Sequence, residues 1–152
     1  TIVGTGSLKS EIISLIQKKK LTKIITHKNR VSHNQIKEIL KNCDIYVSLN
    51  KLGNLSNANL ECFSSGICSI VLDKNPEMLS DLNMNKYFGK KSLIKIPHDS
   101  IQKELKNKLS YLINNKSKIN FYAKNIHKRA LKVVKTWDER INIEKKLIEK
   151  IK

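Results

Sequence analysis

Long apolar runs and aromatic rings are scarce in this sequence, and each shortage excludes a class of protein. The longest apolar stretches, such as Ile67–Leu72, are far shorter than the roughly 20 residues that a membrane-spanning helix needs. Aromatic residues make up only 5% of the chain, and Lys rather than Arg dominates the basic residues. Nucleic-acid-binding proteins typically use aromatic stacking and Arg-rich patches. We therefore expect no membrane span, and a basic nucleic-acid-binding domain is the weakest of the alternative functions.

Cysteine is also scarce, and its spacing predicts no chemistry. The three cysteines, Cys43, Cys62 and Cys68, have neither the spacing of a zinc site nor an even count for pairing. We expect buried thiols in a reducing compartment. The chain opens on Thr1 without a Met and shows no signal peptide. The sequence therefore predicts a fragment of a longer, cytoplasmic protein.

Acidic residues are few, and the excess of positive charge has two interpretations. Thirty Lys and Arg face 13 Asp and Glu, a formal net charge of +17 with a pI near 9.9. Such a charge attracts phosphorylated ligands or anionic surfaces. Abundant Lys, Asn and Ile are equally typical of an AT-rich genome, in which case the Lys residues form a solvated coat.

The charge is concentrated in the last third of the chain. Residues Ile101–Lys152 hold 15 Lys and Arg against five Asp and Glu, a net charge of +10. Within this part Lys124, Lys128 and Lys132 lie one helical turn apart. They form either a solvated helix face or a contact with an anionic membrane surface, which would make the protein peripheral on the cytosolic face of a membrane.

Apolar periodicity predicts an α/β fold in which strands alternate with helices. This order is typical of a Rossmann-like parallel sheet with helices on both faces. We expect a single domain over residues 1–152, with an α/β core at 1–98 and a helical tail at 99–152. The expected strands are Thr1–Val3, Lys23–Thr26, Asp44–Leu49, Cys68–Leu72 and Ser92–Ile96, and the expected helices before the tail are Ser7–Lys19, His33–Lys41 with Ser32 as N-cap, Asn57–Ser65 and a short one near Pro76–Leu82.

The stretch from Asn50 to Leu72 carries the clearest chemical signal. A strand ends, a loop rich in Gly, Asn and Ser follows, and a helix begins near Ser56 or Asn57. A helix N-terminus at the carboxyl edge of a parallel sheet points free backbone N–H groups at an anion, and the helix dipole favours negative charge. Glu61 could accept hydrogen bonds from ribose hydroxyls. On these residues alone, a plain helix cap with a solvated Glu61 is an equal alternative.

The same stretch resembles the signature of glycosyltransferase family 4, the retaining enzymes of GT-B fold, whose pattern is roughly E-G-x-x-N-x-x-L-E-A-M-A-x-G-x-P-V-I. Four further segments resemble other motifs of that family, in order along nearly the whole chain. The matching segments are Leu60–Gly66 with the strand Cys68–Leu72, Ile2–Gly6, Arg30–His33, Cys43–Ser48 and Thr136–Arg140. The resemblance implies that the chain is the C-terminal half of a GT-B fold, with the N-terminal acceptor-binding domain absent.

By this resemblance, the chain binds a nucleotide-diphospho-sugar and transfers the sugar with retention to a glycan or lipid-linked acceptor. Glu61 would bind the ribose, the backbone of Ser56, Asn57 and Ala58 would face the diphosphate and sugar, and Val31 with Arg30 would lie beside the base. No cofactor and no metal are implied, because a helix N-terminus can stabilise the leaving diphosphate.

One position departs from the family pattern. The first glutamate of the family's paired motif should stand eight residues before Glu61, where this chain has Gly53, followed by Asn54 as a neutral substitute. A degenerate nucleotide-sugar-binding module without transfer activity is therefore the main alternative. No general base is visible, so no catalytic residue is named, and the isolated half is expected to be inactive.

Overall fold

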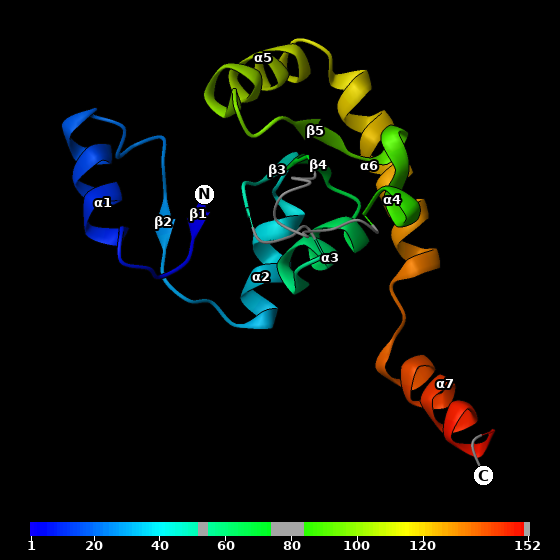
Figure 1. Ribbon diagram of the computed structural model, residues 1–152. Coiled ribbons are helices and arrows are strands. Elements are labelled where there is room, and N and C mark those ends of the chain that lie inside the picture. The colour runs from blue at the N-terminus through cyan, green and yellow to red at the C-terminus, as the bar shows by residue number, and fades with distance from the viewer. Residues whose placement is uncertain (52–54, 74–83, 151–152) are drawn as a thin grey trace. The chain divides into compact units, whose positions relative to one another are not determined.

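The computed structural model describes residues 1–51, 55–73 and 84–150, which form two compact units, Thr1–Asn42 and Cys43–Lys152. Figure 1 labels the elements of each unit along the chain. Whether the two units form one domain stays a prediction. The expected short helix near Pro76–Leu82 lies outside the described residues.

The first unit holds a two-stranded parallel sheet and two helices. Its elements are β1 (Ile2–Val3), α1 (Lys9–Lys18), β2 (His27–Lys28) and α2 (His33–Lys41). In the sheet, Ile2 pairs with His27 and Val3 with Lys28. Helix α2 has the predicted bounds because Ser32 and Gln35 form a capping box: the Ser32 hydroxyl accepts from the Gln35 N–H, and the Gln35 amide oxygen accepts from the Ser32 N–H.

The predicted second strand is wrong in its position. The β-branched run at Lys23–Thr26 favours a strand, but the N–H groups of Ile24 and Ile25 both donate to the Leu21 carbonyl. These bonds form a turn that follows α1, and the strand starts directly after the predicted one ends. Local turn hydrogen bonds therefore override β-propensity at this point.

The second unit holds a three-stranded parallel sheet of order β3-β4-β5 with five helices in the described residues. Tyr46 pairs with Ser69, and Val71 pairs with Lys95. Parallel pairing and alternation with helices confirm the predicted fold class, although the described strands form two sheets rather than the one expected. The elements are β3 (Ile45–Ser48), α3 (Asn57–Ser64), β4 (Cys68–Leu72), α4 (Met84–Ser92), β5 (Ile94–Ile96), α5 (Ile101–Ile113), α6 (Lys116–Val133) and α7 (Trp137–Glu149).

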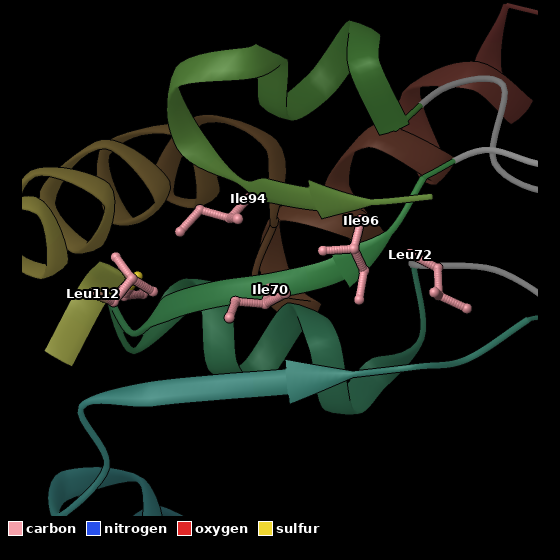
Figure 2. Packing of buried hydrophobic residues seen from close by; sticks show 6 residues of the cluster. Ile70, Leu72, Ile94, Ile96 and Leu112 are labelled. Atoms are coloured by element: carbon pink, nitrogen blue, oxygen red, sulfur yellow. The ribbon is translucent and has the colours of Figure 1, made fainter. Parts of the chain in front are cut away.

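Strand β4 is central in this sheet, and its five residues are all buried. Figure 2 shows side chains from β4, β5 and α5 packed together, namely Ile70, Leu72, Ile94, Ile96 and Leu112. Side chains of α5 and the start of α6 pack against this cluster, as do Ile45 and Val47 of β3. Because successive side chains of a strand point to opposite faces, Tyr46 lies on the other face, where its hydroxyl donates to Asn59 of α3. Helices therefore lie on both faces, as predicted.

Helices α3, α4 and α6 are held together by specific contacts. The rings of Phe63 and Phe88 meet edge to face with centroids 5.0 Å apart, joining α3 to α4. His127 of α6 contacts the end of α3, with Nδ1 2.7 Å from the Ser64 carbonyl oxygen. Gly66 follows with a φ of 71°, and a Cβ there would lie 3.2 Å from the His127 Cβ. Glycine at this position therefore both ends α3 and admits the close approach of α6.

Helix α4 was not expected from the sequence, and β5 begins two residues after the predicted start at Ser92. The helix contains Gly89, whose backbone leaves helical geometry at φ 56° and ψ 168°. Only five residues of α4 precede this break, too short a run for its apolar spacing to predict a helix. The three later helices, α5, α6 and α7, confirm the predicted helical tail, and Thr136 and Glu139 form a capping box at the start of α7.

Candidate functional site

The candidate site is built around the first turn of α3. Strands β3 and β4 are parallel, so both end at the same edge of the sheet. The chain leaves β3 at Ser48, and α3 begins after Ser56, which caps it: the Ser56 hydroxyl accepts from the Asn59 N–H at 3.3 Å. The helix start at Ser56 and Asn57 is as predicted. Gly53 and Asn54, which stand at and beside the position of the family's first glutamate, lie outside the described residues.

The first turn of α3 leaves two backbone donors that the helix does not use. The Asn59 N–H is capped by Ser56, and the Leu60 N–H donates to the Ser56 carbonyl at 2.9 Å. Helix geometry gives the N–H groups of Asn57 and Ala58 no acceptor within the helix, and both residues are exposed. Among the described residues, this turn is therefore suited to a negatively charged ligand.

A partly buried hydrogen bond fixes this turn against the sheet. Asn59 is completely buried, and its side-chain oxygen accepts from the Tyr46 hydroxyl at 2.7 Å. Burial, followed by the charge of Cys62, raises the pKa of Tyr46, so its hydroxyl keeps its proton and acts as a donor. This pair could not be expected from the sequence, because a polar residue in the first turn of a helix ordinarily caps it or is solvated.

Glu61 lies one turn from the helix start and is half-buried. Its charge contributes to raising the pKa of both Tyr46 and Cys62. Burial is the larger cause for Cys62, whose pKa rises to about 12. Glu61 therefore borders a cluster of buried polar groups behind the first turn of α3.

The two remaining predicted residues belong to the other unit. Arg30 is exposed and Val31 is half-buried, and both lie between β2 and α2. Ser56, Asn57, Ala58 and Glu61 lie together in the first two turns around α3, in the second unit. The structure thus brings four of the seven predicted residues together.

A mainly apolar hollow of about 280 Å³ lies beside α3. Leu55 and Leu60 line it together with Val133 and Val134 from the end of α6, and Arg140 of α7 reaches it. The Arg140 guanidinium also lies 5.1 Å from the centre of the Trp137 ring. The Thr136–Arg140 segment therefore caps α7 and contributes a cation beside α3.

Two histidines and two cysteines of the second unit have structural positions. His98 lies with Nε2 2.7 Å from the Asp73 carbonyl oxygen, joining the ends of β4 and β5, and His127 contacts the end of α3. Cys62 and Cys68 are buried free thiols, as predicted, and Cys43 is half-buried. Within the described part of the chain, no group of three or more His, Cys, Asp or Glu could hold a metal ion.

A comparison with protein families decides the wider assignment. A model described as glycosyl transferases group 1 matches residues 1–132. The chain belongs to this family. The match runs through both compact units and most of α6, and it includes the first turn of α3. Membership of this family supports a transferase function, and it agrees with the observed fold, which is that of a Rossmann-like half of a GT-B enzyme. No match was found among curated proteins.

Proposed function

We propose that the chain is the donor-binding half of a retaining glycosyltransferase of family 4, and that it binds a nucleotide-diphospho-sugar at the first turn of α3. The observation that carries the proposal is this turn, which lies at the carboxyl edge of a parallel sheet with the N–H groups of Asn57 and Ala58 outside the helix's own bonding. Ligands of open α/β sheets bind at this edge. Membership of the group 1 family makes a sugar donor the fitting ligand.

The proposed chemistry assigns each residue a binding role. The N–H groups of Asn57 and Ala58 bind diphosphate oxygens, and the Ser56 cap with the Tyr46–Asn59 bond holds the turn in place. Glu61 accepts hydrogen bonds from the ribose. The resemblance to family 4 also assigns Asn54, Arg30 and Val31 to donor binding, the last two to the base.

In the transfer step, negative charge grows on the leaving diphosphate as its bond to the anomeric carbon breaks. A fixed helix N-terminus stabilises this charge without reorganising, which is the role that a metal ion has in other transferases. The acceptor is a glycan or a lipid-linked molecule, and it is bound by an N-terminal domain. The proposed location is the cytoplasm.

A nucleotide-sugar-binding module without transfer activity is the second candidate. Gly53 favours it, because this residue stands where the family pattern has the first glutamate of its pair. A glycine has no side chain to hold the transferred sugar. The two candidates share the donor site and differ only in turnover, which an assay with the full-length protein distinguishes.

The donor site is tested by titrating the chain with a nucleoside diphosphate and following backbone amide shifts by NMR. We expect one site, with the largest shifts at Ser56–Glu61 and at Arg30 and Val31. Glu61→Ala should weaken binding by about 1.5–3 kcal/mol, the range for losing a hydrogen bond to a charged group. The matched control is Glu144→Ala, which removes an exposed carboxylate of α7 and should leave the affinity unchanged.

Two results would refute the donor site. Shifts confined to the Lys residues of α6, lost in moderate salt and unaffected by Glu61→Ala, would mean that the ligand responds only to bulk charge. Equal losses of affinity from Glu61→Ala and Glu144→Ala would also mean that the ligand does not contact Glu61 specifically.

A further inference from the structure

Helix α6 has an outer face that neither the fold nor the donor site uses. Its inner face is fixed by Ile126 and Ala130, both completely buried. The helical repeat places Lys124, Lys128 and Lys132 on the opposite side, and all three are exposed. Within the described residues, none of these three Lys side chains forms an ion pair.

Two large apolar side chains share this outer face. Phe121 is 44% exposed and Leu131 is 64% exposed, and their spacing from Lys124 and Lys128 places them on the same stripe. The Lys118 ammonium lies 5.8 Å from the centre of the Phe121 ring, which adds a further cation beside the stripe. The face therefore combines exposed apolar groups with uncompensated positive charge. We call these five residues, Phe121, Lys124, Lys128, Leu131 and Lys132, the α6 outer face.

Charge distinguishes α6 from α7, which also exposes large apolar side chains. Helix α7 exposes Trp137 and Leu147, but its three basic residues are outnumbered by four acidic ones. Helix α6 has six basic residues over Lys116–Val133 and no acidic one. A surface that attracts anions and also gains from burying apolar groups is therefore found on α6 and not on α7.

We propose that the α6 outer face docks the protein on an anionic membrane surface. The three Lys ammonium groups bind lipid headgroup phosphates, and Phe121 and Leu131 enter the boundary between headgroups and acyl chains. Amphipathic helices with Lys on one side and large apolar groups beside them bind lipid interfaces in this way. A nucleic acid fits this face less well. The α6 outer face has a single ring for base stacking and no Arg, and a nucleic acid would offer Leu131 no apolar environment.

The test is co-sedimentation of the 152-residue chain with phosphatidylcholine vesicles, with and without phosphatidylglycerol. Binding should require phosphatidylglycerol and fall as salt rises. The triple variant Lys124→Gln, Lys128→Gln, Lys132→Gln should reduce partitioning by roughly 100-fold, since each Lys near an anionic surface contributes about fivefold. The matched control is Lys18→Gln, Lys19→Gln, Lys23→Gln, which removes the same charge from exposed positions of the first unit and should cost less than about fivefold.

A second variant tests the apolar part of the α6 outer face. Phe121→Ala should weaken partitioning by roughly five- to tenfold, and this loss should persist at a salt concentration that removes the effect of the Lys variants. Equal losses from the two Lys triples, or equal binding to vesicles without phosphatidylglycerol, would overturn the proposal. Binding to single-stranded RNA that the α6 triple abolishes, with no binding to vesicles, would replace it with a nucleic-acid surface.

Discussion

The two compact units follow the same alternation of strand and helix, but they bury very different amounts of their side chains. Ile16 is the only buried hydrophobic residue in Thr1–Asn42, whereas Cys43–Lys152 buries Phe63, Ile70, Phe88 and a dozen others. All aromatic residues and all three cysteines lie after residue 42. Alternation of elements therefore determines the type of fold in both units, while the stable core depends on aromatic rings and on the fully buried strand β4.

Removing a core ring should produce the largest difference between the units. Phe63 is completely buried and contacts Phe88, so Phe63→Ala should cost about 3–5 kcal/mol of the free energy of unfolding. The control, Leu15→Ala, truncates a side chain of the first unit that is 54% exposed and should change stability by less than about 0.5 kcal/mol. Urea unfolding followed by circular dichroism measures both. Similar costs for the two variants would mean that the first unit has a comparable core.

The sequence predicted elements best where a strong local signal and tertiary packing agree. Strand β4 and helix α2 have their predicted bounds, because a nearly all-apolar strand and a Ser-x-x-Gln capping box each specify one structure. The segment Lys23–Thr26 was predicted wrongly because its β-branched residues suit a strand while the backbone bonds at Leu21 form a turn. In α4, the break at Gly89 leaves only five residues before it, too few for an apolar pattern to predict a helix.

The candidate site was predictable only in part. The Ser56 cap and the start of α3 follow from residue types at fixed spacing. The Tyr46–Asn59 bond joins residues 13 apart in the chain, and its importance depends on the complete burial of Asn59. No periodic pattern distinguishes a buried Asn in a first helical turn from a solvated one. Only the hydrogen bond between β3 and α3 shows that the first turn of α3 has an internal anchor.

Alkaline pH should destabilise the second unit in particular. Burial raises the pKa of Cys68 to about 11, and burial with the charges of Cys43 and Glu61 raises that of Cys62 to about 12, both from an ordinary value of 9.0. Because both pKa values are raised on folding, this stabilisation is complete below about pH 9 and is lost as pH rises toward 11 and 12. The first unit has no Cys or Tyr to titrate there.

The measurement compares the urea midpoint of the chain with that of a Cys62→Ala, Cys68→Ala variant at rising pH. The variant loses packing at every pH but has no buried thiol to ionise. Its stability deficit should therefore narrow as pH rises from 9 to 11. A deficit that stays constant would contradict the raised pKa values, and the shared ionisation of Lys residues cancels in the comparison.

The smallest expected effect separates two capping boxes of the same geometry, one in each unit. In α2 the Ser32 N–H donates to the Gln35 amide oxygen at 2.8 Å, and in α7 the Thr136 N–H donates to a Glu139 carboxylate oxygen at 2.8 Å. Only the Glu139 carboxylate can take up a proton as the pH falls, because the Gln35 amide does not titrate. The backbone N–H of Thr136, followed by its hydroxyl, lowers the pKa of Glu139 from 4.5, so this cap is fully formed above that value and is lost as pH falls through the lowered pKa.

The amide shift of Thr136 in NMR spectra should therefore titrate in acid, while that of Ser32 stays constant. Glu139→Gln should abolish the titration without removing the cap. A Ser32 amide that titrates together with Thr136 would show that acid loosens both helices by a common cause, and the contrast between the two boxes would fail.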